Sequence, residues 1–218
     1  MTDAIVSING AGMQSLEILT LITLIMLLPS ILIMMTCFTR IVIVLSLLRN
    51  AMGLQQTPPN TVIIGIALFL SLFIMQPVIS DINTNAYEPY KADTISQQQA
   101  LDNATVPIKQ FMLKQTKVES LNVFLNFADM KRPSNLMEIP MHVVIPAFMT
   151  SELNRAFLMG FLLYIPFLVI DMIVASVLMS MGMVMLPPSM ISMPFKLLLF
   201  VVVNGWELLF STMVSSFN

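Results

Sequence analysis

Long apolar stretches flank a polar middle in this chain. Residues 18–39 carry no charged side chain, and a second uncharged stretch runs from residue 50 to residue 80. Beyond the middle, residues 156–170 and 172–195 are uncharged as well. A helix that crosses a bilayer needs about 20 mostly apolar residues. The pattern therefore predicts four candidate membrane segments, at residues 18–46, 62–80, 156–178 and 190–213.

These apolar stretches are expected to be helical, because backbone in lipid must satisfy its hydrogen bonds internally. Prolines divide them. Pro29, Pro77 and Pro166 lie inside apolar runs, where we expect each to kink or end a helix. The pairs Pro58-Pro59 and Pro187-Pro188 indicate hairpin connections. No strand-like alternation or β-hairpin turn signal is visible. The predicted fold class is all-α, with helical hairpins built from proline-broken hydrophobic helices.

The polar middle also has a helical pattern. Its apolar side chains recur at intervals of three, four and seven, at Ile108, Phe111, Met112, Val118, Leu121, Leu125 and Ala128. This predicts an amphipathic stripe, with Thr105 as the helix cap and Pro107 in the first turn. We expect its apolar face to contact neighbouring copies of the chain; the alternative is packing within the chain. Three parts follow: an N-terminal hydrophobic hairpin at 1–80, a polar helical segment on the exported side at 81–139, and a C-terminal hydrophobic hairpin with a Met-rich loop at 140–218.

Composition supports a membrane protein. Only 10% of the 218 residues are charged and the mean hydropathy is +0.87, whereas soluble domains have about 25% charged residues. This excludes a disordered chain and argues against an ordinary soluble domain. The net charge of −2 gives no basic field for nucleic acid. Arg49 in the connection 47–61 favours a cytoplasmic first connection and an exported polar middle.

Catalytic and metal-binding motifs are missing from the sequence. There is no phosphate-cradling GxxxxGK[ST], no HExxH and no GxSxG. His142 is the only histidine and Cys37 the only cysteine, and both lie among apolar neighbours. We expect a packed or interfacial histidine and an inert thiol in the core. We therefore predict a protein that is not an enzyme, with no metal site and no cofactor.

Isolated charges occur in the apolar ends. Such charges are costly in lipid, so we expect them to be buried in protein and paired, with partners on neighbouring copies. Contact with a transported substrate is the alternative, and a proton relay is a further one for Asp171. The candidates are Arg40, Arg49, Glu152, Arg155, Asp171 and Lys196.

Four methionines alternate with other residues in Met179–Met185, followed by Leu186 and the double proline. In an extended backbone all four side chains would lie on one side. Several copies could then form a deformable apolar collar that gates a pore, because thioether side chains are flexible. The alternative is ordinary packing between helix neighbours four residues apart, since the chain contains 21 methionines. The candidate gate residues are Met179, Met181, Met183 and Met185.

Long segments of the chain resemble the bacterial flagellar biosynthetic protein P family. The resemblance rests on FTRIVIVLSLLRNAMG (38–53), PPN (58–60), IPAFMTSELNRAFLMGF (145–161), IPFLVIDMIVASVLMSMGMVMLPP (165–188) and MPFKLLLFVVVNGW (193–206). YEPY (87–90) and VPIKQFMLKQT (106–116) are similar to flagellar members in particular. The injectisome paralogues of the R/P type are related but less similar.

The resemblance implies a core subunit of the flagellar type III export gate, in the bacterial inner membrane at the flagellar basal body. It implies a ring of five copies with the flagellar Q and R proteins, contacts with the flagellar B and A export proteins, and unfolded flagellar proteins as substrates. It also implies that much of the chain lies on the periplasmic side, and that the four methionines close the pore.

Two features depart from that family. Asn204 stands where an Asp usually precedes Gly-Trp, and the N-terminus has no basic region typical of a signal peptide. The alternative functions are an injectisome gate subunit and a small-solute secondary transporter, although the latter would favour internal repeats that this sequence lacks.

Overall fold

The computed structural model describes residues 6–8, 11–13, 15–183 and 185–217. A short antiparallel pair of strands, β1 (Val6–Ile8) and β2 (Ala11–Met13), comes first, with Val6 opposite Met13. The remaining regular elements of the described chain are helices: α1 (Ser15–Met34), α2 (Phe38–Ala51), α3 (Asn60–Ile82), the π-helix η1 (Asn83–Tyr87), α4 (Glu88–Lys91), α5 (Gln97–Gln115), α6 (Val118–Phe127), the 3₁₀ helix η2 (Leu136–Glu138), α7 (Met141–Ser180), α8 (Pro188–Val202) and α9 (Gly205–Ser215). The predicted all-α class is confirmed, although the short strand pair was not predicted.

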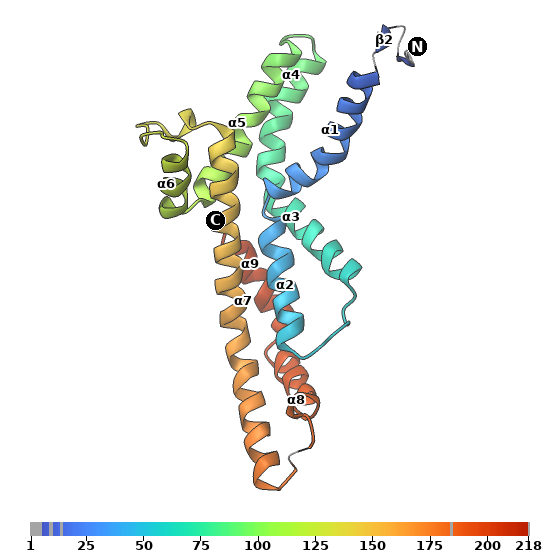
Figure 1. The fold of residues 1–218 in the computed structure, drawn as a ribbon, viewed down its shortest axis with the longest axis vertical. Helices are drawn as coiled ribbons and strands as arrows, with labels where there is room; N and C mark the ends of the chain where they lie inside the picture. Colours follow the sequence, from blue (N-terminus) through green and yellow to red (C-terminus); the bar gives the residue numbers. More distant parts are fainter. Residues whose placement is uncertain (1–5, 9–10, 14, 184, 218) are drawn as a thin grey trace.

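Helix α7 runs along the length of the molecule (Figure 1). Helix α2 packs along it, and α8 and α9 return beside it from the lower end. The first part of α3 lies on the side of α2 away from α7, and α1 leans away from the body. Helices α4 and α5 form the upper end and α6 lies to one side of α7, so the polar middle caps one end of an apolar body.

The boundaries of the first predicted segment were wrong. Residues 18–46 form two helices rather than one segment, because the chain turns between α1 and α2 at residues 35–37. Thr36 makes the turn possible: its hydroxyl donates to the Ile33 carbonyl at 2.8 Å and accepts the Phe38 amide at 3.3 Å. These bonds satisfy backbone groups that a helix end leaves without partners.

The single prolines do not end helices. Pro29 lies within α1, Pro77 within α3 and Pro166 within α7, and each helix continues past its proline. One lost backbone hydrogen bond is tolerated where neighbouring helices hold the segment. The double prolines do mark connections as predicted, since Pro59 directly precedes α3 and Pro188 begins α8.

The amphipathic stripe is divided between two helices. Helix α5 begins ten residues before Pro107, at a capping box in which the Ser96 hydroxyl accepts the Gln99 amide, so Thr105 is not the cap. The chain then turns at residues 116–117, and both α5 and α6 pack on α7. Met112, Leu121 and Leu125 are buried in one cluster with residues 143–148 of α7. The expected contact with neighbouring copies is therefore replaced, for these side chains, by packing within the chain.

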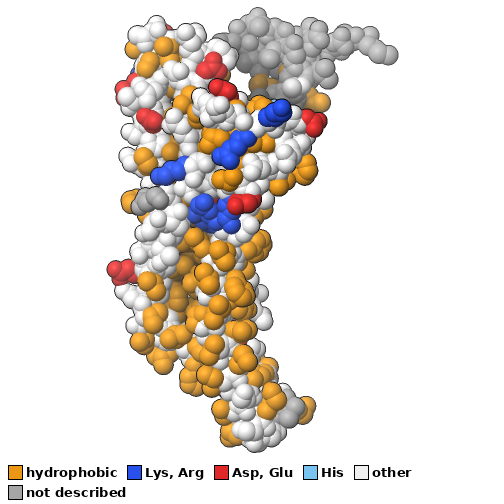
Figure 2. All heavy atoms as spheres, turned by 90° about the vertical axis from the view of Figure 1, so that its left-hand side faces the viewer, with side chains coloured by type: hydrophobic (Ala, Val, Ile, Leu, Met, Phe, Trp, Pro, Cys, Tyr) orange, Lys and Arg blue, Asp and Glu red, His pale blue; other side chains and the backbone are white. Residues whose placement is uncertain are grey.

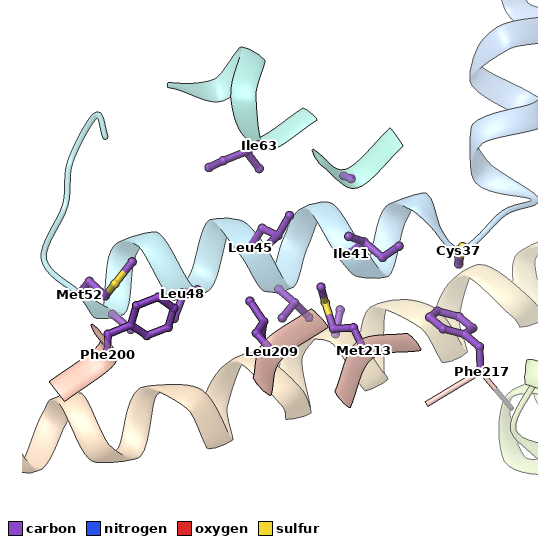
Figure 3. Close-up of a cluster of buried hydrophobic side chains, with 14 of the residues drawn as sticks. Cys37, Ile41, Leu45, Leu48, Met52, Ile63, Phe200, Leu209, Met213 and Phe217 are labelled. Carbon is purple, nitrogen blue, oxygen red and sulfur yellow. The ribbon is translucent and has the colours of Figure 1, made fainter. Parts of the chain in front are cut away.

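The main core lies where α2 meets α7, α3 and the last helix. Ile41, Leu45 and Leu48 of α2 belong to one buried cluster with Ile63 of α3 and with Leu209 and Met213 of α9; in Figure 3 Leu45 lies on the side of α2 that faces Ile63. Gly160 allows the close approach of α7 to α2, because a Cβ at this position would lie only 3.0 Å from the Leu47 Cβ. This core places the buried charges of α2 and α7 next to each other.

Among the described residues, two helices are long and apolar enough to cross a membrane: the continuous helix from Asn60 to Lys91, and α7. A third span is possible if α8 and α9, which meet at 64°, count as one broken segment. Figure 2 shows charged side chains gathered over the upper part of one face and apolar side chains dominating the lower part. This division is that of a membrane-associated protein with a polar end.

Candidate functional site

The four candidate gate methionines lie at the end of α7, in the connection to α8 at the lower end of the molecule (Figure 1). The exposed fractions of their side chains are 65% for Met179, 62% for Met181, 42% for Met183 and 98% for Met185. None of the four is buried in its own chain. None of them belongs to a hydrophobic core cluster of the described chain.

The segment is not extended over Met179–Met183. Helix α7 ends in a turn in which the Met183 amide donates to the Leu178 carbonyl at 3.0 Å and the Gly182 amide to the Met179 carbonyl at 3.1 Å. Gly182 has φ +78°, the left-handed conformation that glycine adopts without a Cβ clash. These two bonds form a Schellman cap. The methionines therefore surround a tight turn at the tip of a helical hairpin, which we call the methionine tip (Met179–Met185); residue 184 lies outside the described residues.

Arg40 and Glu152 form a fully buried ion pair between α2 and α7. Both side chains are 0% exposed. The Arg40 Nε donates to Glu152 Oε2 at 2.8 Å and its Nη2 donates to Oε1. The pair is bidentate, the arrangement in which an Arg–carboxylate interaction is strongest.

The same guanidinium also holds the end of the chain. Its Nη1 donates to the Ser216 hydroxyl at 2.9 Å, and its carbon lies 3.7 Å from the centre of the Phe217 ring. The Gln115 side chain joins this cluster, because its Nε2 donates to the Phe217 carbonyl at 3.0 Å and its Oε1 accepts from Arg40 Nη2 at 3.3 Å. Arg40 thus connects α2, α5, α7 and the segment after α9.

Asp171 and Lys196 form a second ion pair, between α7 and α8. The Lys196 Nζ lies 2.6 Å from Asp171 Oδ2 and donates to the Ala51 carbonyl, at the end of α2, at 3.0 Å. The Ser192 hydroxyl donates to the other Asp171 oxygen at 2.5 Å. This cluster fixes the hairpin that carries the methionine tip to the end of α2. Four of the six candidate charges therefore find partners within the chain rather than on a second copy.

The remaining candidates, Arg49 and Arg155, have neutral partners. Arg49 Nη1 donates to Asn60 Oδ1 at 2.7 Å and to the Pro58 carbonyl at 3.2 Å, which closes the connection between α2 and α3. Arg155 Nη1 donates to Gln115 Oε1 at 2.7 Å. Within the described residues, neither guanidinium forms an ion pair.

Sequence reasoning missed the neutral members of these clusters, Gln115, Ser192 and Ser216. No local signal distinguishes them from the chain's other Gln and Ser residues, since their partners lie 21 to 176 residues away. His142, in the first turn of α7, is exposed rather than packed within the chain, so of the two expected positions only the interfacial one stays a prediction. No group of three metal-ligating side chains occurs in the part of the chain that the structure describes.

Cys37 is expected to resist alkylation in the folded protein. Its side chain is 0% exposed and its thiol lies 3.3 Å from the Ser71 hydroxyl. Burial raises the pKa of the thiol to about 11, so the reactive thiolate is scarce at neutral pH. Mass spectrometry after maleimide treatment at pH 7.5 should show unmodified native protein and complete labelling after unfolding. Rapid labelling of the native protein would contradict the buried position.

Comparison with known proteins identifies the family. Residues 21–213 match the FliP family. The flagellar biosynthetic protein FliP of Bacillus subtilis is 53% identical over 204 residues, which cover 94% of this chain and 92% of the relative. The proteins of the same name from Aquifex aeolicus and Pectobacterium carotovorum are 51% and 49% identical, each over 96% of this chain and over 89% and 82% of the relative. The resemblance predicted from the sequence is confirmed, and this chain belongs to the FliP family.

Proposed function

We propose that this chain is a core subunit of the flagellar type III protein export gate, through which unfolded flagellar proteins cross the inner membrane. The proposal includes a ring of five copies, with the flagellar Q and R proteins as partners and contacts to the flagellar B and A proteins. It has no catalytic step. Membership of the FliP family, whose relatives carry the name flagellar biosynthetic protein, supports the flagellar assignment over an injectisome.

One structural observation carries the gate: four flexible apolar side chains are exposed together at the tip of a long helical hairpin. Apolar side chains exposed in a single copy favour a partner surface. In a ring, the tips of several copies would meet near the axis and form the collar, even though each tip is a turn rather than an extended segment. Thioether side chains can close such a constriction or fit around a passing chain at small rotamer cost.

The three parts of the chain then have separate roles in this proposal. Residues 1–80 supply the helical hairpin around α2 and α3, and residues 81–139 form a layer on the exported side. Residues 140–218 supply α7, α8 and α9, and place the methionine tip in the pore. The Arg40 and Asp171 clusters hold these parts together within each copy.

Replacing Met181 and Met185 by alanine should make the closed gate leak ions. Shorter side chains widen the collar, and a hydrophobic constriction excludes ions only while it stays narrow. The fold of each copy should be unaffected, because both side chains are exposed in the single copy, and assembly should survive the truncation of two side chains in a connecting segment. Conductance of the purified complex in planar bilayers measures the effect, with Met190→Ala as the control, since Met190 is also exposed, at 66%, but lies in α8. A double variant that assembles and conducts no more ions than the parent would contradict the proposed gate.

A further inference from the structure

Arg155 and Glu207 carry opposite charges, and neither forms an ion pair within the described residues. Arg40 pairs with Glu152 and Lys196 with Asp171, and Arg49 is held by the loop beside it. Arg155 on α7 donates a hydrogen bond to the neutral Gln115 side chain and interacts with Glu152, already paired with Arg40, only at longer range. Glu207 on α9 contacts only the side-chain amide of Asn204.

Both charges lie among exposed apolar side chains. One helical turn after Arg155, Leu158 is 54% exposed. Trp206 and Leu208, the sequence neighbours of Glu207 on α9, are 39% and 60% exposed. If an interface covers such a charge, an opposite charge must meet it there, because an unpaired buried charge is costly. Arg and Trp are also residue types that are enriched at the centres of protein interfaces.

The two charges lie at similar levels along the molecule. Arg40 contacts both Glu152 of α7 and Ser216 after α9, so these residues share a level. Arg155 follows Glu152 by three residues, or about 4.5 Å of helix. Glu207 precedes Ser216 by nine residues, or at most about 14 Å along the inclined α9. The offset between the two levels is thus within about 10 Å, which two long side chains and a small axial shift between copies can close.

We infer that Glu207 of one copy pairs with Arg155 of the neighbouring copy. In a closed ring, each interface joins two different faces of the same chain. In this chain, one face carries Arg155 on α7 and the other carries Glu207 on α9. The inference rests on the ring in the proposed function and assigns one of its contacts. Asn204, the side chain that contacts Glu207 at this bend, is neutral, so it leaves the charge of Glu207 unbalanced.

The first test is a charge exchange in the full chain, co-expressed with its gate partners and analysed by native mass spectrometry. Glu207→Arg should lower the recovery of multi-copy assemblies about tenfold, because like charges then face each other. Arg155→Glu should do the same, and the double variant should restore recovery. Glu119→Arg, which reverses an exposed acid on α6, is the matched control and should assemble like the parent.

A disulfide test does not depend on how well Arg155→Glu folds. In the variant Arg155→Cys/Glu207→Cys, oxidation should link neighbouring copies into dimers and larger species, whereas each single cysteine variant should not. The buried Cys37 does not interfere. A lack of crosslinks between copies, or a disulfide within one copy, in an assembly that forms normally would overturn the pairing. The pairing would also be overturned if the double charge-exchange variant did not recover assembly. Release of a bound anionic phospholipid by Arg155→Glu, without that recovery, would likewise contradict the pairing. A parent chain that forms no multi-copy assembly would contradict the proposed function itself.

Discussion

Replacing Glu152 by alanine is expected to lower the free energy of unfolding by about 3 to 5 kcal/mol, the cost typical of a broken buried ion pair. The Arg40 guanidinium would remain fully buried with no carboxylate partner. It would keep only Ser216, Gln115 and the Phe217 ring, which are neutral. For a chain of this size we expect the thermal midpoint to fall by about 10 °C, measured in detergent.

The double variant Arg40→Met/Glu152→Leu tests whether stability is lost because the ion pair is absent or because one buried charge is left without a partner. Replacing both charges by apolar side chains of similar volume is often neutral or stabilising. We therefore expect the double variant to be more stable than Glu152→Ala alone. Glu119→Ala, which removes an exposed acid, should change the midpoint little. If Glu152→Ala unfolds at the parent's temperature, the ion pair does not hold α2 to α7.

Helix formation was predictable from the sequence, but helix ends were not. Apolar runs identify α3 and α7 because their composition decides the structure of backbone in an apolar environment. The break between α1 and α2 depends instead on one hydroxyl, that of Thr36, and on the packing of α2 against α7. Pro107 illustrates the reverse error. It looked like a helix start, yet it lies inside α5, whose start is set by Ser96 and Gln99.

The charges of the candidate site were predictable one by one, but their pairing was not. Arg40 and Glu152 are 112 residues apart, and only the fold brings them together. Asp171 and Lys196 flank the Pro187-Pro188 connection, so a hairpin at that point was the available signal for this pair. The conformation of the methionine tip was missed because the alternating pattern suggested extended backbone, whereas Gly182 provides the left-handed residue of a helix cap.

The two members of the Asp171–Lys196 pair differ in burial, and this difference has a consequence for stability. The Lys196 side chain is 4% exposed and that of Asp171 is 31% exposed. Removing the carboxylate leaves a buried ammonium with only the Ala51 carbonyl as a partner. Removing the ammonium leaves a carboxylate that still accepts from Ser192 and reaches solvent. The loss should therefore be larger when the more exposed partner is replaced.

Asp171→Ala is accordingly expected to lower the free energy of unfolding by about 3 kcal/mol, and Lys196→Met by clearly less, because unpaired buried charge is the costly product. Methionine also fills the volume of the lysine side chain with apolar atoms. Thermal unfolding of both variants in the same detergent measures the order, and Asp102→Ala, which removes an exposed acid on α5, is the control. Because the pair joins α8 to the end of α2, Asp171→Ala should also make the connection that carries the methionine tip more sensitive to protease. Equal midpoints for the two variants, or a larger loss for Lys196→Met, would contradict this explanation. The Asp171 carboxylate would then not stabilise the fold by pairing with the buried Lys196 ammonium.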